Sequence, residues 1–355
     1  MPSLGYHKAM KKRTKVLIIS GSALGVIAGI GFLSVYFTLL YRYKGRQVDN
    51  LWSKDDPFSL ASVKTLQKKK GKDFVILNFA DIQLCDLEDT FTKESVHRIM
   101  DKLVSEHKPD LITLTGDQTW SNENLLSLRS ILRWLESYKV PYAPVFGNHD
   151  HGNEFSSAVA GLHYCCDLYE DSPHCLFSRG PTNIDRLGNY PINIVEEGKV
   201  VKTLYFLDLG YFDSISHKQR DWFCYTADGI ENELGYAPEG MMFTHKDFPS
   251  FRNAYRHYLD GSAQNSGDVY VNGGYSYVEE DGFVELAKQH GVTDFLCGHQ
   301  HWNNFTIQDN GARFTFCLKT GPYGGIYQDD SLTLSGGTVI TIGEETKITH
   351  HLEGA

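Results

Sequence analysis

The stretch DFVILNFADIQL, residues 73–84, joins an apolar run directly to two polar side chains. The run from Phe74 to Phe79 has the length and composition of a buried β-strand. Asp81 follows it almost at once, and Gln83 comes two residues later. A carboxylate at the buried end of a strand is costly unless an opposite charge compensates it. The stretch therefore predicts a strand, and it raises the question of which group compensates Asp81.

The same arrangement recurs along the chain: an apolar run ends in a turn that contains Asp, Asn or His. Taken singly, each turn is weak evidence, because Gly-Asp after a strand is usually only a turn. The pair His299 and His301 is stronger, because alternate residues of an extended segment share a face. Carboxyl ends of strands in open α/β sheets are where ligands bind, so the turns together predict one convergent site. They are Asp81-Ile82-Gln83, Gly116-Asp117, Gly147-Asn148-His149-Asp150, His245 and Gly298-His299-Gln300-His301.

Strands and helices alternate in the first half of the predicted body, and strands outnumber helices in the second. This order favours an α/β sandwich with one or more mixed sheets. Two segments between predicted strands, 231–240 and 261–268, are expected to be surface loops. Strands are expected at 73–80, 110–116, 140–147, 202–209, 239–245, 292–298, 312–318 and 337–342, and helices at 92–107 and 124–138.

The ordered motifs ADIQ, GDQ, GNHD, a lone His and GHQH resemble those of the calcineurin-like metallophosphoesterases, the superfamily that includes the purple acid phosphatases. The resemblance extends from about Asp73 to Ile342. The stretches GNY at 188–190 and CGHQHWNNF at 297–305, followed by LKTG at 318–321, are similar to a membrane-anchored or secreted bacterial branch. The resemblance implies a four-layer α/β/β/α sandwich with mixed β-sheets.

The resemblance also implies two adjacent metal ions (iron, zinc or manganese) with a bridging hydroxide that attacks a phosphate mono- or diester. Asp117 would bridge both ions and is expected to be a catalytic residue as well as a ligand. His149 is expected beside the phosphate as proton donor or transition-state stabiliser, and Asn148 is expected to share the contact with substrate. The other ligands would be Asp81, Gln83 and His301 for the first metal, and Asn148, His245 and His299 for the second.

Two positions depart from the commonest pattern of the superfamily. Gln83 stands where histidine is usual, and an amide oxygen is a weaker donor than imidazole. Trp120 falls where purple acid phosphatases have a ligating tyrosine, and indole offers no ligand atom. The first metal therefore has fewer strong donors than the second. The alternative function is a catalytically weak or silent membrane-anchored ectodomain that binds a phosphorylated ligand.

Several neighbours of these motifs remain open between two interpretations. Either Asp150 or Asp110 is expected to hold the second ring nitrogen of His149, unless both are turn aspartates. His151 is expected in a solvated loop rather than behind the site. Aromatic side chains near the last motif either line a substrate pocket or fill the core; they are Trp302 and Tyr323.

The N-terminal part has a different character. Residues 1–50 contain eight Lys or Arg and one acidic residue, whereas the whole chain has a formal net charge of −10. The rest of the chain is therefore strongly acidic, which argues against nucleic acid as the main partner. Residues 16–40 lack any charge, and 25 residues at about 1.5 Å each can cross a hydrocarbon core of roughly 30 Å. A cleaved signal peptide is the weaker alternative, because the run is long and no small-x-small site follows it.

We therefore expect a cytoplasmic basic segment at 1–15, a transmembrane signal-anchor helix at 16–41, a polar linker at 42–71 and a metallophosphoesterase domain at 72–355. Five basic residues precede the span and three follow it, so the body should lie outside the cytoplasm as a single-pass membrane protein. Small residues at every fourth position of the span are either a homodimer contact or only common glycines. They are Gly21, Gly25 and Gly29.

The chain has seven cysteines, an odd number that leaves at least one thiol unpaired within an exported chain. Cys166 and Cys175 are close enough in sequence to close a short loop, but buried thiols are the plainer expectation. Asn304-Phe305-Thr306 is an N-glycosylation sequon, and its closeness to the GHQH motif predicts that burial blocks it.

Overall fold

The computed structural model describes most of the chain from residue 44 onward. The described residues are 31, 44–85, 90–120, 124–151, 161–210, 214–265, 267, 269–271, 274–275, 281–321 and 334–353. The predicted basic segment and the predicted membrane span, 1–41, lie outside them apart from Gly31. Among the described residues, no helix is both long enough and apolar enough to cross a membrane.

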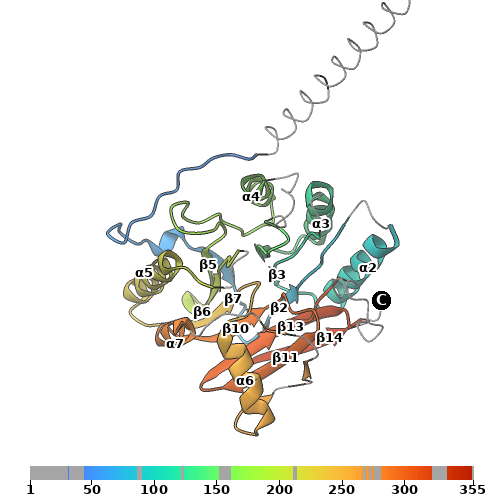
Figure 1. Ribbon diagram of the computed structural model, residues 1–355. Helices are drawn as coiled ribbons and strands as arrows, with labels where there is room; N and C mark the ends of the chain where they lie inside the picture. Colours follow the sequence, from blue (N-terminus) through green and yellow to red (C-terminus); the bar gives the residue numbers. More distant parts are fainter. Residues whose placement is uncertain are drawn as a thin grey trace, which may run out of the picture. The chain divides into compact units, whose positions relative to one another are not determined.

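Three early strands and the last two strands of the body build a mixed five-stranded sheet of order β14-β13-β2-β3-β4. Strands β2, β3 and β4 are parallel, and β13 and β14 run antiparallel. Helix α2 packs against β2 and β13, and Figure 1 shows α2 and α3 beside this sheet. All strands and helices predicted for this sheet are confirmed, whereas β14 is an addition. The bounds are β2 Phe74–Phe79, α2 Thr90–His107, β3 Leu111–Thr115, α3 Asn124–Tyr138, β4 Tyr142–Val145, β13 Gly336–Ile342 and β14 Thr346–Leu352.

The second sheet has nine strands in the order β1-β5-β6-β7-β10-β12-β11-β8, with β9 paired to β11. Its predicted strands β6, β7, β10 and β12 are confirmed, and the rest of the sheet was not predicted. The strands are β1 Lys64–Gln67, β5 Tyr190–Glu196, β6 Lys199–Phe206, β7 Glu239–Phe243, β8 Gln264–Asn265, β9 Tyr270–Val271, β10 Val292–Cys297, β11 Asn303–Asp309 and β12 Ala312–Phe316. The remaining helices are η1 Leu60–Ser62, α4 Leu162–Glu170, α5 His217–Leu234, α6 Pro249–Leu259 and α7 Phe283–Gln289.

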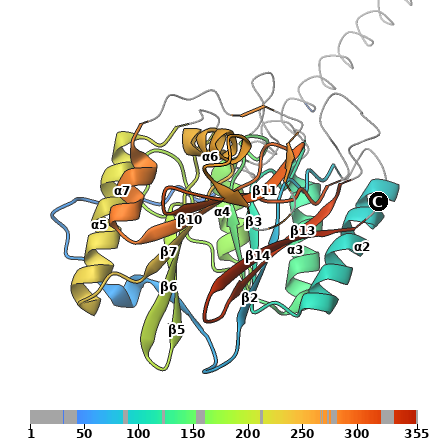
Figure 2. The same ribbon diagram turned by 90° about the horizontal axis from the view of Figure 1, so that it is seen from below.

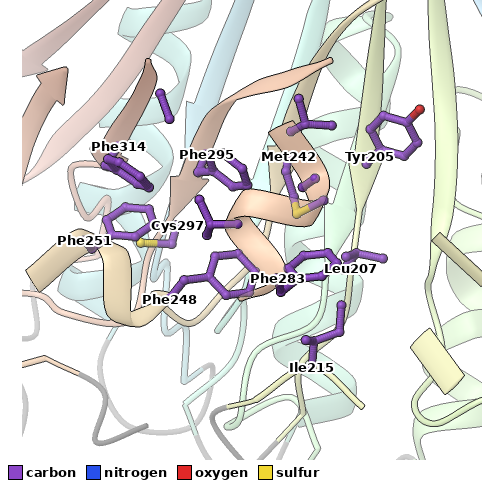
Figure 3. Close-up of a cluster of buried hydrophobic side chains, with 14 of the residues drawn as sticks. Tyr205, Leu207, Ile215, Met242, Phe248, Phe251, Phe283, Phe295, Cys297 and Phe314 are labelled. Atoms are coloured by element: carbon purple, nitrogen blue, oxygen red, sulfur yellow. The ribbon is translucent and has the colours of Figure 1, made fainter. Parts of the chain in front are cut away.

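Helices α5, α6 and α7 cover one face of the nine-stranded sheet with an apolar core. Figure 2 shows α5 and α7 on one flank and α2 and α3 on the opposite flank, with α6 near the middle of the upper edge. The core beneath them is rich in aromatic rings, and in Figure 3 Phe251 lies beside Phe314 and Phe283 lies beside Phe248. Burying such rings stabilises the fold by about 2–3 kcal/mol each, and the ring pairs fix how the helices sit on the strands.

Polar contacts join the two sheets at the end opposite the predicted site. Lys202 of β6 is buried, and its Nζ donates to Thr346 Oγ1 of β14 at 3.0 Å and to Asp294 at 3.4 Å. Arg313 of β12 donates to the Thr346 carbonyl at 2.7 Å and to Asp294 at 2.7 Å. A buried charge is tolerated when it is paired in this way. The sheets are therefore held together by specific charged contacts as well as by apolar packing.

The predicted linker at 42–71 is wrong from Gly45 onward, because that part of the chain belongs to the folded unit. Strand β1, which lies inside the predicted linker, pairs in parallel with β5. Arg46 Nε donates to Asp167 Oδ1 at 2.9 Å, and Arg179 Nη2 donates to the same oxygen at 2.7 Å. Polar composition misled the prediction, since the segment is held by backbone pairing, by ion pairs and by a few apolar side chains, Trp52, Phe58 and Leu60, that pack against the core.

Two smaller expectations concern covalent modification. Cys166 and Cys175 are buried thiols and are not joined, as the plainer expectation had it. Asn304 lies on β11 with 5% of its surface exposed, so the sequon is blocked by burial as expected.

Candidate metal centre

Two groups of potential metal ligands share one carboxylate. Asp81, Asp117 and His301 form the first group, and Asp117, His245 and His299 form the second group. Within each group the possible ligand atoms lie within 4.8 Å of one another. The residues follow β2, β3, β7 and β10, so strand ends from both sheets meet at this point. The structure thus brings together the carboxylates and imidazoles that the sequence predicted, with Asp117 common to both groups.

The backbone at these strand ends is held in an unusual conformation. Asp81, Gln83, Asp117 and His299 have φ values of 48°, 47°, 50° and 69°, which lie in the left-handed region. Each such residue costs of order 1 kcal/mol or more, and such strain clusters at functional sites. Gly147 shows how close the turns approach, since a Cβ there would lie 2.2 Å from Asp117 Oδ1. The fold therefore bears strain in order to place these side chains.

On the side of the second group, His245 is fixed by the backbone beneath it. Its Nδ1 donates to the Thr115 carbonyl at 2.8 Å, which directs Nε2 toward the site. That nitrogen lies 3.3 Å from Asp117 Oδ2, 3.1 Å from Asn148 Oδ1 and 3.2 Å from His299 Nδ1. All four predicted ligands of the second metal therefore converge on a small space. The carbonyl contact is the kind of outer partner that orients metal-binding histidines.

The protonation of this cluster agrees with a cation site. Burial raises the pKa of Asp117, but the charge and hydrogen bond of His245, together with the charges of His149 and His299, outweigh it and hold that pKa well below its ordinary value. Burial lowers the pKa of His245, yet Asp117 raises it to about 9. Burial and the neighbouring charge of His245 keep the pKa of His299 well below its usual range. The proton on His245 thus occupies the place that a cation would take, and metal binding would displace it.

On the side of the first group, Asp81 is held by the turn that contains the histidine pair. The backbone N–H of His299 donates to both carboxylate oxygens, at 3.1 and 3.0 Å. His301 Nε2 lies 3.1 Å from Asp81 Oδ1. Gly298 is needed for this approach, because a Cβ there would lie 2.5 Å from Asp81 Oδ2. These contacts and a bound cation together would compensate the buried carboxylate.

Gln83 reaches the same space with its amide. Its Nε2 lies 3.3 Å from Asp117 Oδ2 and 3.0 Å from His301 Nε2. Its Oε1 is buried, and no described residue donates to it. The two ends of an amide are assigned from their contacts, and a half-turn of the amide would bring the oxygen to the ligand position. Gln83 is therefore at the predicted site, with its nitrogen turned toward the two neighbouring ligands.

His149 lies at the edge of the cluster and is held by an aromatic ring. Its imidazole stacks on Trp120, with ring centroids 4.5 Å apart and planes at 26°. Its Nε2 is 3.8 Å from Asp117 Oδ2, and its backbone N–H donates to Asp117 Oδ1 at 2.8 Å. Trp120, which offers no ligand atom, therefore contributes by orienting the imidazole.

Neither aspartate proposed to hold the His149 ring does so. Asp110 accepts from the backbone N–H of Val75 at 2.9 Å, at the far end of the strands. Asp150 accepts from the backbone N–H groups of Gly147 and Thr119, at 2.8 and 3.1 Å. Both carboxylates instead accept backbone hydrogen bonds, which agrees with the second of the two interpretations that were open.

A His–Asp pair beside the cluster was missed by the sequence analysis. His151 is not in a solvated loop as expected, because its Nε2 lies 2.8 Å from Asp208 Oδ2 and that carboxylate is fully buried. Asp208 follows the end of β6 and also accepts from Gly210 N–H at 2.7 Å. The pair ties the loop after β4 to the nine-stranded sheet. Trp302 lies near His301, with ring centroids 5.9 Å apart, and Tyr323 is outside the described residues.

We expect Trp120→Ala to lower kcat for a phosphate ester by about fivefold, since one stacked aromatic pair contributes about 1 kcal/mol. Trp120→Phe keeps a ring under His149 and should restore most of the rate. Metal content measured on the same samples should be unchanged in both variants. An alanine variant with full kcat, or a phenylalanine variant no better than alanine, would contradict an orienting role.

Comparisons with known proteins agree with this geometry. The model of the calcineurin-like phosphoesterase family matches residues 74–303. The chain is 24% identical over 246 residues to "Probable inactive purple acid phosphatase 29" of Arabidopsis thaliana, over 61% of each chain. It is 24% identical over 301 residues to "Phosphatase DCR2" of Saccharomyces cerevisiae, over 77% of this chain and 50% of that protein. The chain thus spans less than two thirds of the length of these relatives.

Among solved structures, purple acid phosphatase PPD1 from seeds of yellow lupin (Lupinus luteus) is similar with a TM-score of 0.47 and 12% identity. The match covers 80% of this chain and 53% of that one. The family model alone covers well over half of the chain and includes all the turns that form the cluster. The resemblance read from the motifs is therefore confirmed, and the chain belongs to the calcineurin-like phosphoesterase family.

Proposed function

We propose that the protein is a metal-dependent phosphoesterase with two adjacent metal ions, which hydrolyses phosphate mono- or diesters. The observation that carries this proposal is the shared carboxylate of Asp117, which belongs to both groups of potential ligands. A single carboxylate common to two sets of donors is suited to hold a pair of adjacent cations. The helices on the outer flanks of both sheets also support a four-layer α/β/β/α sandwich.

Some residues of the cluster are suited to bind the metal ions, and others are suited to contact the substrate. Asp117 would hold both ions, with Asn148, His245 and His299 at one and Asp81 and His301 at the other. Bound cations would supply positive charge for the phosphoryl oxygens and would acidify a coordinated water.

His149 is suited to donate a proton or a hydrogen bond to an oxygen of the substrate, because its ring lies beside the shared carboxylate. Trp120 keeps that ring in place through stacking. Asn148 lies on the same turn and brings an amide to the same edge, 3.1 Å from His245 Nε2. The turn thus presents both predicted substrate contacts together.

A catalytically silent ectodomain that binds a phosphorylated ligand is the second candidate. It is favoured by one observation, the amide nitrogen of Gln83, which points at His301 and Asp117 where a ligand oxygen is needed. A relative named as a probable inactive phosphatase adds to the case for testing it.

The test is metal analysis of the purified full-length chain, followed by assays with a chromogenic phosphate monoester and diester. The chain is first stripped with a chelator and then supplied with zinc, manganese or iron singly. We expect about two metal ions per chain, no hydrolysis in the stripped form and recovery with at least one metal. Binding of metal without hydrolysis of either ester would favour the silent ectodomain, and no metal binding at all would refute the metal-dependent phosphoesterase.

We also propose that the segment 16–41 anchors the chain in a membrane with the body outside the cytoplasm. Its apolar run and the excess of basic residues before it support this orientation. Protease added to intact cells should then release the body. Cleavage that occurs only after lysis would show the opposite orientation.

A further inference from the structure

Lys319 is a buried lysine whose ammonium group touches only neutral oxygens. The residue is 2% exposed, and its Nζ donates to the Gly321 carbonyl at 2.8 Å and to Ser335 Oγ at 3.0 Å. No carboxylate of the described residues forms an ion pair with it. A buried charge of this kind is costly unless a nearby opposite charge compensates it.

The backbone around Lys319 lies alongside the turn that holds Asp81. Lys319 forms a parallel β-bridge with Ala80, and the next residue donates from its N–H to the Ala80 carbonyl at 2.7 Å. Gly321 N–H donates to the Asp81 carbonyl at 3.1 Å. Gly321 is required there, because a Cβ would lie 2.7 Å from that carbonyl oxygen. The segment from Lys319 to Gly321 therefore supports Asp81 from behind.

The charge nearest in effect to the Lys319 ammonium is also that of Asp81. Burial lowers the pKa of Lys319 to about 8, and the one charge that opposes this effect is the carboxylate of Asp81. Asp81 is itself 2% exposed and faces the first metal site with its oxygens. A positive charge behind this carboxylate and a cation in front of it compete for the same negative charge.

We propose that Lys319 is a positioning residue that balances the charge of Asp81 from behind and thereby lowers the affinity of the first metal site. The inference rests on the proposed metal site and goes beyond it, since it assigns an electrostatic role to a residue that is not a ligand. Without metal, the ammonium stabilises the buried carboxylate. With metal, it repels the cation and keeps the first ion exchangeable.

The chain offers a matched control in Lys202. It is equally buried at 2% exposed, and it donates to Thr346 Oγ1 at 3.0 Å. Its position on β6 is six residues before Asp208, which at about 3.3 Å per residue separates it from the site edge by roughly 20 Å. Neutralising Lys202 removes a buried charge with little influence on the metal site.

The experiment compares the full-length wild type with Lys319→Met, Lys319→Arg and Lys202→Met. Each stripped protein is titrated with manganese in a calorimeter and melted with and without metal. His301→Ala identifies the binding step of the first metal, because His301 belongs to the first group only. If Lys319→Met does not fold, Lys319→Gln is used, since its amide can still donate to the Gly321 carbonyl.

We expect Lys319→Met to bind the first metal at least about tenfold more tightly, which corresponds to about 1.4 kcal/mol, and to melt at a lower temperature when stripped. Lys319→Arg should keep the affinity of the wild type, and Lys202→Met should lose stability without a change in affinity. Unchanged or weaker binding of the first metal in Lys319→Met and Lys319→Gln would overturn the inference while leaving the metal site intact. A wild type that binds no manganese, zinc or iron would instead overturn the proposed function.

Discussion

Replacing Asp117 with alanine is expected to abolish metal binding at both sites and to lower turnover by about a thousandfold or more, a loss of roughly 4 kcal/mol of transition-state stabilisation. The reason is that one carboxylate belongs to both groups of ligands, so its removal leaves neither group complete. Asp117 also accepts from the backbone N–H of His149, and its loss frees the turn that presents His149 to substrate.

The variant Asp117→Asn tests whether metal binding needs the negative charge of this side chain, because it keeps the size of the side chain and removes the charge. It should bind metal weakly at both sites and remain nearly inactive. Asp110→Asn is the matched control, since Asp110 caps a strand at the opposite end and accepts only a backbone hydrogen bond among the described contacts.

The measurements are metal content of each purified variant and kcat for a phosphate ester at saturating metal. Asp110→Asn should retain two metals and the activity of the wild type. An Asp117→Ala protein that keeps one tightly bound metal, or that hydrolyses substrate at a near-normal rate, would refute the shared-carboxylate arrangement.

The strands that carry the ligands were predictable from sequence because most of their residues are buried. Each of the four strands, β2, β3, β7 and β10, contains an apolar run that is followed within two residues by Asp or His. One short stretch therefore indicates both the strand and the ligand that comes after it. The convergence of Asp81, Asp117 and His245 then follows from the rule that strand ends of an α/β sheet share an edge. What the pattern could not reveal is the left-handed backbone at Asp81 and Asp117, since that strain comes from the contacts between turns.

Two of the elements that were missed, β1 and α5, have polar or local signals. Strand β1 is an edge strand with one partly buried residue among four, so it has no apolar run. Helix α5 has a capping box between Ser216 and Gln219 and ends at Gly235 in the left-handed region. Those signals were present in the sequence, and the predicted loop at 231–240 begins inside that helix. Local capping evidence would have been a better guide there than turn-forming composition.

Asp208 has the strand-end pattern of the ligands but is not a member of either ligand group. The run before it ends in a carboxylate just as the run of β2 ends before Asp81. Its charge is compensated by His151 and not by a predicted ligand, as the distance of 2.8 Å shows. The same strand-end rule therefore identifies groups at the edge of a site without separating ligands from their supports. The contacts that each side chain makes with neighbouring turns are what distinguish the two.

Replacing Gln83 with histidine is expected to tighten the first metal site by about ten- to a hundredfold, the range by which changes around a metal site alter affinity. In the wild type that site has firm donors in Asp81, Asp117 and His301, while Gln83 presents its amide nitrogen to two of them. An imidazole at this position adds a donor that suits zinc, iron and manganese better than an amide oxygen does. The second site shares only Asp117 with the first, so its affinity should change little.

The wild type should accordingly lose its first metal before its second on dilution into chelator, and its activity should depend on the free metal concentration. Calorimetric titration of wild type and Gln83→His at one pH measures both steps, and Gln118→His is a matched control, because Gln118 donates to the Val145 carbonyl at 2.9 Å and belongs to neither group. Tighter binding need not raise kcat, because a stronger donor also makes the metal a poorer Lewis acid. Two equally tight sites in the wild type, unchanged by the substitution, would mean that the Gln83 amide turns its buried oxygen to the metal and already acts as a full ligand.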